Sequence, residues 1–159
     1  MSLLPRVTAS THESVALDFD TRGPEVCTTE ILGQLERDNP ELLKMAVKCA
    51  ADSGDPSGLM VGFGMFYRLL AEQSPDSGVA IPYVEPETRD LLVAEIDERG
   101  IESFTLKAIS ELETANPELL QMAHRFASQF ENYLHAIQGF ALLYRSLAVQ
   151  AMQRPGRLH

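Results

Sequence analysis

The chain has 159 residues, of which 45% are hydrophobic, and its formal net charge is −10. This length and composition are typical of one compact domain with a substantial buried core. The acidic charge argues against nucleic-acid binding, which needs a basic face. We find no apolar run near about 18 residues and no secretory signal pattern, so we predict a cytoplasmic protein without a membrane span.

One stretch of the sequence occurs twice. Residues 35–46 read Leu-Glu-Arg-Asp-Asn-Pro-Glu-Leu-Leu-Lys-Met-Ala, and residues 112–123 read Leu-Glu-Thr-Ala-Asn-Pro-Glu-Leu-Leu-Gln-Met-Ala. The offset in numbering is 77 (112 minus 35), and it also aligns Gly62 with Gly139. Twice this offset is nearly the whole chain, which indicates a tandem duplication resembling a fused dimer about a pseudo-twofold axis. We predict an all-α, bundle-like domain with repeats at 1–77 and 78–154 and a flexible tail at 155–159.

Each repeat is expected to hold roughly four helices. The first would cover about 11–22, and its counterpart would begin near Pro86 and end before Gly100. Proline in the first turn and glycine after the end favour a helix in the second copy. In the first copy, Val15, Leu17 and Phe19 alternate with Ala16, Asp18 and Asp20, which also fits a strand. We favour a helix by analogy with the second copy.

The second helices are expected at 28–38 and 105–115, each ending at an Asn-Pro dipeptide. Proline disfavours helical geometry at the residue before it but suits the first turn of a helix. Asparagine is a favourable N-cap residue. Asn39 and Asn116, each followed by proline, therefore predict that a third helix begins almost without a loop.

The fourth helices are expected at about 56–73 and 133–152, and the break near 131–133 is the weaker of the two. Both are apolar on most sides, as buried helices are. We therefore expect them at the centre, where the repeats meet and Gly62 and Gly139 allow a close approach. Their remaining apolar side predicts the interface of a homodimer or higher oligomer, formed by Met65, Leu69, Leu142 and Val149.

No pattern predicts a catalytic or metal site. Cys27 and Cys49 align with phenylalanines of the second copy, so we interpret both as buried apolar positions. We interpret the histidines, among them His12, as surface residues. Glu131 and His135 stand one turn apart but lack the repeated pattern of metal-binding bundles. We predict no catalytic residues, no metal and no cofactor, and we lean away from an enzyme, although catalytic side chains can meet from distant positions.

The polar residues that occur in both copies are the candidate site. Arg68 and Arg145 lie on the flanks of the central helices, where an enclosed guanidinium needs carboxylate partners. We interpret them as ties to acids present in both copies, with a ligand site as the alternative. The possible groove or ion-pair residues are Arg68, Arg145, Tyr67, Tyr144, Asp20, Asp97, Glu36 and Glu113, and the further candidate acids are Glu25, Glu102, Glu41 and Glu118.

Two functions remain open. The first is a non-enzymatic interaction or regulatory protein that binds another protein or itself. The second is a small-molecule-binding protein or enzyme with a site in the groove between the repeats, because pockets often form at such interfaces. A deep pocket holding arginine and tyrosine from both copies would favour the second, and a flat apolar patch would favour the first.

Overall fold

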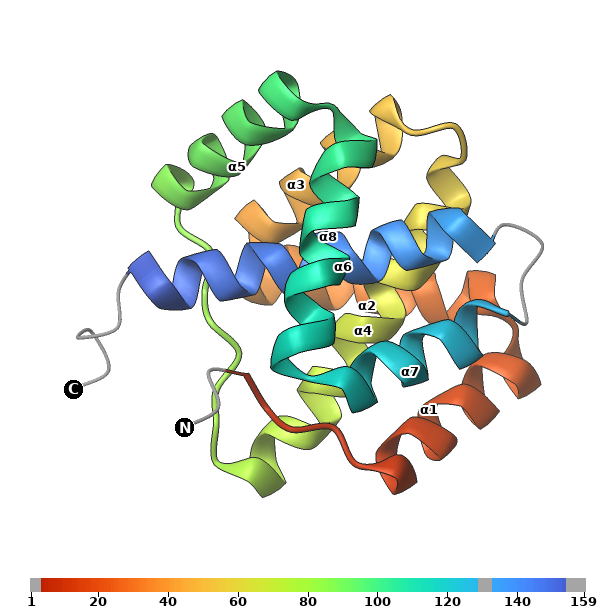
Figure 1. The fold of residues 1–159 in the computed structure, drawn as a ribbon. Helices are drawn as coiled ribbons and strands as arrows, with labels where there is room; N and C mark the ends of the chain where they lie inside the picture. Colours follow the sequence, from red (N-terminus) through yellow and green to blue (C-terminus); the bar gives the residue numbers. More distant parts are fainter. Residues whose placement is uncertain (1–3, 129–132, 154–159) are drawn as a thin grey trace.

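The computed structural model describes residues 4–128 and 133–153, and within these ranges the fold is all-helical (Figure 1). The predicted tail at 155–159 and most of the predicted break near 131–133 lie outside these ranges. The helices of the described residues are α1 Ala9–Arg22, α2 Pro24–Asp38, α3 Pro40–Asp52, α4 Pro56–Ser77, α5 Pro86–Arg99, α6 Ile101–Ala115, α7 Pro117–Ala127 and α8 Tyr133–Gln153.

The element whose sequence fitted either a helix or a strand is the helix α1. It begins after Thr8, whose hydroxyl accepts a hydrogen bond from the Thr11 N–H at 3.3 Å. Val15 and Phe19, one helical turn apart, are both buried. The helical period therefore places both side chains in the core, while their polar neighbours face outwards.

The helices α2 and α6 begin four residues earlier than predicted. Pro24 follows Gly23 directly, and Ile101 follows Gly100 directly, so a single glycine separates each helix from the one before it. The φ angles of these glycines are 94° and 84°. Residues other than glycine rarely adopt such positive φ angles, so these glycines allow the chain to turn here without a loop. Both helices end at the predicted Asn-Pro dipeptides.

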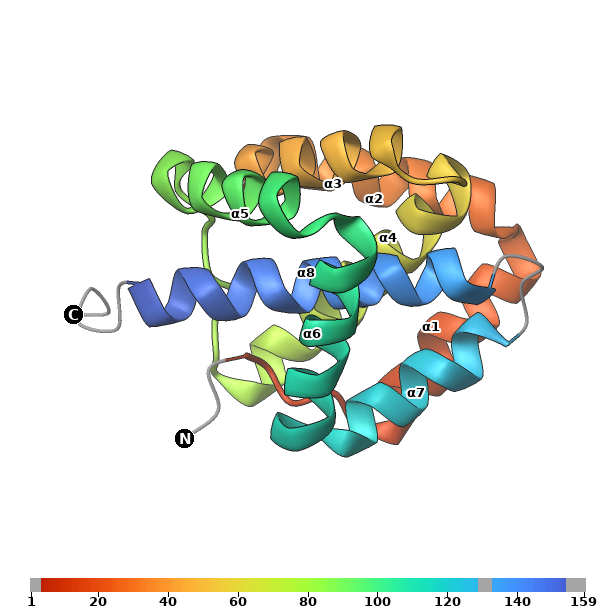
Figure 2. The same cartoon turned by 45° about the horizontal axis from the view of Figure 1, so that its top comes forward.

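The helices α4 and α8 pack against each other at the centre, as expected, and form the most extensive helix contact. In both views α3 lies beside α5, and α1 lies beside α7 (Figures 1 and 2). The helices α1, α2 and α3 contact α4, while α5, α6 and α7 contact α8. Each long helix is thus surrounded by the three other helices of its own half and by the long helix of the other half.

At their crossing, α4 and α8 touch through their backbones. A Cβ atom added to Gly62 would lie 2.0 Å from the Ala136 carbonyl oxygen, and one added to Gly139 would lie 2.1 Å from the Leu59 carbonyl oxygen. Protein interiors are close-packed, so an alanine at either position would force the helices apart. Backbone atoms fill this part of the space between the halves.

The chain itself covers most of the residues that predicted an oligomer interface. Met65 and Leu69 are fully buried, and Leu142 is 1% exposed. Val149 is half-buried and packs against the same core. The apolar side of each long helix is covered by other helices of the same chain, so these four residues give no reason for a second copy. The homo-oligomer stays a prediction.

Candidate functional site

Two clusters of charged side chains contain the candidate arginines, one in each half of the chain. Each contains an arginine of a central helix together with charged residues from the first two helices of that half, and the first cluster also includes Glu72 of the central helix α4. The first arginine cluster comprises Arg68, Asp18, Arg22, Glu30 and Glu72, and the second arginine cluster comprises Arg145, Glu95, Arg99, Lys107 and Glu111.

In the first arginine cluster, Asp18 on α1 is the shared acceptor. Nε and Nη2 of Arg22 each donate to one Asp18 oxygen at 2.7 Å, and Nη1 of Arg68 donates to Asp18 as well. The remaining donors reach outwards, from Arg22 Nη1 to Glu30 at 2.8 Å and from Arg68 Nε to Glu72 at 2.9 Å. The hydrogen bonds from Arg22 and then Arg68 hold the pKa of the Asp18 carboxyl well below its usual range, so this carboxylate stays charged.

In the second arginine cluster, Arg145 is the shared donor. Its Nη1 donates to both oxygens of Glu111 at 2.9 and 3.1 Å, and its Nη2 donates to both oxygens of Glu95 at 3.2 and 3.4 Å. Arg99 and Lys107 stand farther from Glu95, at 4.0 and 3.9 Å. The two carboxylates therefore depend mainly on one guanidinium.

Both candidate arginines pair with carboxylates, but not with the acids expected from the sequence. Asp20, Glu36 and Glu113 are exposed, and Asp97 pairs with Lys48 at 3.5 Å. The prediction considered only acids identical in the two copies. The acid that contacts the central arginine is aspartate at position 18 and glutamate at position 95, which the repeat offset aligns with each other. A search for matching charge would have found this pair.

The candidate tyrosines are buried or half-buried. Tyr67 is buried, and this burial raises its pKa to about 12. Tyr144 is half-buried, and burial followed by the nearby Glu111 raises its pKa too. Arg68 and Arg145 share no ion-pair partner. The ion pairs of the two arginines therefore involve different residues, and the common groove stays a prediction.

The cysteines are buried and free, as interpreted from the sequence, whereas the interpretation of His12 as a surface residue is wrong. Burial raises the pKa of both thiols, that of Cys49 to about 12, so they stay protonated and unreactive near neutral pH. His12 is 8% exposed, and its Nε2 has no hydrogen-bond partner. The sequence offset of 77 aligns His12 with Arg89, a charged residue, so this alignment gave no indication of a core histidine.

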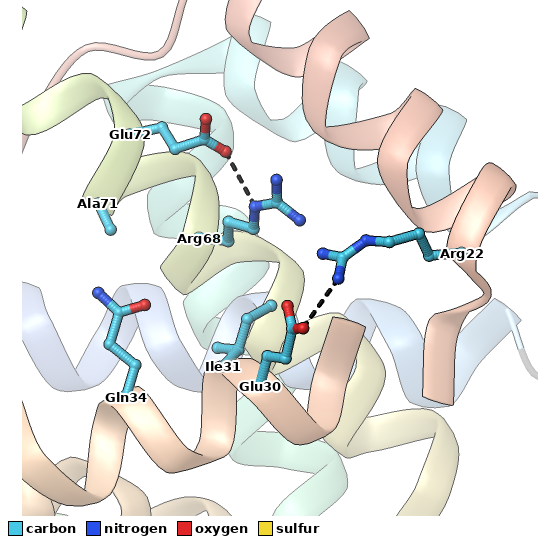
Figure 3. Close-up of a pocket in the computed structure, with 7 residues that line it drawn as sticks. All are labelled: Arg22, Glu30, Ile31, Gln34, Arg68, Ala71 and Glu72. Carbon is cyan, nitrogen blue, oxygen red and sulfur yellow. Dashed lines mark hydrogen bonds and ion pairs between the residues drawn. The ribbon is translucent and has the colours of Figure 1, made fainter. Parts of the chain in front are cut away.

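A hollow of about 340 Å³ opens beside the first arginine cluster between α1, α2 and α4 (Figure 3). Five of its seven lining residues are polar or charged, and Ile31 and Ala71 supply the apolar part. The Gln34 carboxamide has no hydrogen-bond partner among the described residues. The lining residues are Arg22, Glu30, Ile31, Gln34, Arg68, Ala71 and Glu72.

The two clusters carry opposite net charge. The first has two cations and three carboxylates, which sum to −1, and the second has three cations and two carboxylates, which sum to +1. At the sequence offset of 77, four of the seven lining positions align with a different residue, while Arg22, Arg68 and Ala71 align with identical ones. Glu30 aligns with Lys107, Gln34 with Glu111, and Glu72 with Val149.

Comparison with protein families, with curated proteins and with solved structures gives no match for this chain. In the part of the chain that the structure describes, no helix combines the length and the apolar character needed to cross a membrane. The same part holds no group of three or more His, Cys, Asp or Glu side chains suited to a metal ion. The chemistry of the two clusters therefore carries the functional inference.

Proposed function

We propose that the chain is a non-enzymatic interaction protein that binds a partner protein at the hollow beside the first arginine cluster. The observation that carries this proposal is the polar, accessible lining of that hollow. Small-molecule pockets are mostly apolar and enclose most of their ligand. Here the side chains of Glu30 and Glu72 are 58% and 43% exposed, so a ligand would remain largely in water. Such a hollow suits one side chain of a protein whose remaining contacts lie on the surrounding surface.

The fold supports a second part of the proposal, that the eight helices are two copies of one four-helix unit about a pseudo-twofold axis. The helices α1 to α4 begin at positions 9, 24, 40 and 56, and α5 to α8 begin at 86, 101, 117 and 133, so each start recurs at the offset of the sequence repeat. The contact at the helix crossing is also reciprocal. Gly62 faces Ala136 and Gly139 faces Leu59, and the repeat offset interchanges the two contacts.

Hydrogen bonds repeat with the same offset. The Thr8 N–H donates to Gln73 Oε1 at 3.0 Å, and the Glu85 N–H donates to Gln150 Oε1 at 2.8 Å. In both halves, a buried glutamine of the long helix thus accepts a hydrogen bond from the backbone of the residue that precedes the first helix of that half. Against this common plan, four of the seven residues that line the hollow differ from the residues aligned with them, as expected of a binding site added to a duplicated scaffold.

We also propose a cytoplasmic location, because two free, buried cysteines fit a reducing compartment. Self-association is a separate prediction. Light scattering at micromolar protein concentration checks it, and a mass of 17.6 kDa alone would reject it.

The proposed function is tested by capture with the tagged full-length chain from an extract of its own source cells. The double variant Glu30→Lys, Glu72→Val replaces the two glutamates of the hollow by the residues at the aligned positions of the second half. Lys107→Gln in the second half is the matched control. A partner captured by the parent and the control, and lost with the double variant, supports the proposal. Capture that ignores the double variant contradicts it, and so does the absence of any specific partner.

A further inference from the structure

Resting on the proposed function, we propose that the hollow receives a basic side chain, lysine or arginine, from the partner protein. The charge of the site points this way. The two arginines and two glutamates that line the hollow balance in charge, and Asp18, which does not line it, brings the first arginine cluster to −1. Within a chain of net charge −10, a cation is attracted both by the cluster and by the whole chain. An anion would meet repulsion from both.

The hydrogen-bonding groups of the hollow also suit a cation. Glu30 and Glu72 each accept from an arginine through Oε2, and their Oε1 atoms accept no hydrogen bond from the described residues. The carbonyl oxygen of Gln34 is a further unused acceptor. An ammonium group carries three donors and a guanidinium five, so either can use these oxygens.

The cationic groups of the hollow are already engaged. Both oxygens of Asp18 accept hydrogen bonds from Arg22, and Arg68 donates to Asp18 and Glu72 (Figure 3 draws the bonds to Glu72 and Glu30). Arg68 Nη2 donates no hydrogen bond among the described residues, so a phosphate or carboxylate ligand could use this donor alone and would have to displace an internal carboxylate for any further contact with the two arginines. The apolar side chains of Ile31 and Ala71 offer a surface for the methylene groups of a basic side chain.

The second half supplies an internal reference for this inference. Lys107, at the position aligned with Glu30, stands 3.9 Å from Glu95. The chain thus provides a third cation to its own second cluster, whereas the first cluster has only two. A basic side chain from outside would bring the first cluster to the same number of cations.

The occupant is tested by ¹⁵N NMR titration of the full-length protein, observing the Gln34 side-chain NH₂ and the Arg68 Nε–H. The probes are the N-acetylated methylamides of lysine and arginine, with the norleucine and glutamate derivatives as neutral and acidic controls. We expect saturable shifts of both signals with lysine or arginine at millimolar concentration, and none with the controls. The variant Glu30→Lys, Glu72→Val should weaken binding about fivefold or more, as expected for the reversal of one exposed charge and the loss of another, whereas Lys107→Gln should not.

Saturable shifts with the glutamate probe, or with none of the probes, would overturn the basic occupant. If Gln34 shifts upon concentration of the protein without a probe, the occupant is a second copy of the chain, which also overturns the inference. A partner whose capture depends on Glu30 and Glu72, without a response to the basic probes, would refute this inference and leave the proposed function standing. A response to the basic probes without any captured partner would refute the proposed function instead.

Discussion

The two arginine clusters share one arrangement and differ in what surrounds it. In each half, an arginine of the central helix contacts an acid of the first helix, as Arg68 does with Asp18 and Arg145 with Glu95. Around this pair the first half adds Glu30 and Glu72, which line the hollow, while the second half adds Glu111 and Lys107. The side chain of Arg145 is also less exposed than that of Arg68, 16% against 22%. The arginine–acid pair thus belongs to the architecture, and the charges around it vary without changing the helices.

The largest effect is expected where the halves are alike. Gly62→Ala and Gly139→Ala should each lower the free energy of unfolding by on the order of 3 kcal/mol, because the added methyl group meets a backbone carbonyl of the other long helix. Chemical denaturation measures both effects. The matched control is Gly33→Ala, where the nearest atom to the new methyl is Arg37 Nη1 at 3.9 Å and alanine favours the helix. A large loss at only one glycine would show that the halves do not meet equivalently.

The next largest effect on stability should distinguish the two arginine clusters. Arg145→Met should lower the free energy of unfolding by about 2 kcal/mol, between the values for exposed and buried pairs, because Glu95 and Glu111 lose their main partner. Arg68→Met should have a smaller effect, since Asp18 keeps its two short hydrogen bonds from the arginine on α1. Thermal unfolding of both variants checks the order. A greater loss of stability in Arg68→Met than in Arg145→Met would mean that the ion pairs of Arg68 contribute more to stability than their geometry implies.

A smaller effect on the free energy of unfolding is expected where helices of different halves lie side by side, α3 with α5 and α1 with α7 (Figures 1 and 2). Arg89 on α5 pairs with Glu41 on α3, whereas the aligned residue on α1 is the buried His12, next to α7. Burial, followed by the charge of Arg125, lowers the pKa of His12, while Glu13 on the same helix and a hydrogen bond with the Met122 backbone oppose this shift.

Because the folded pKa lies below the unfolded value of about 6.5, the unfolded chain binds a proton first as the pH falls. Stability from this group is therefore present above about pH 6.5 and is lost as the pH falls towards the folded pKa. We expect the free energy of unfolding of His12→Gln to change less between pH 7 and pH 5 than that of the parent. Urea denaturation at both pH values measures this, and equal changes in the two proteins would rule out the effect.

The smallest change in stability is expected at the rim of the hollow. Glu72→Val should alter the free energy of unfolding by less than about 0.5 kcal/mol, because this side chain is 43% exposed and its pair is an i, i+4 contact on the surface. The same substitution should weaken the NMR response to the lysine probe. A substantial loss of stability would assign Glu72 to the fold rather than to binding.

Local signals predicted the helices well, because caps and breakers act within a few residues. The Asn-Pro dipeptides ended α2 and α6 where expected, whereas the starts of both helices were missed because one glycine replaces a whole loop. The site was harder to predict. The hollow needs side chains from three helices at particular rotations, which hydrophobic periodicity does not specify. Requiring identical residues also excluded Asp18 and Glu95, although the sequence contains their shared charge.

The contact between Gly62 and Gly139 has a consequence for how the molecule moves. Where two helices touch through backbone atoms, no side chain can swing aside to admit water, and the crossing opens only if whole helices separate. Each long helix also carries the other three helices of its half. Amide protons on both sides of the crossing should therefore exchange with solvent only through global unfolding. The two halves should unfold as one cooperative unit, although each has its own arginine cluster.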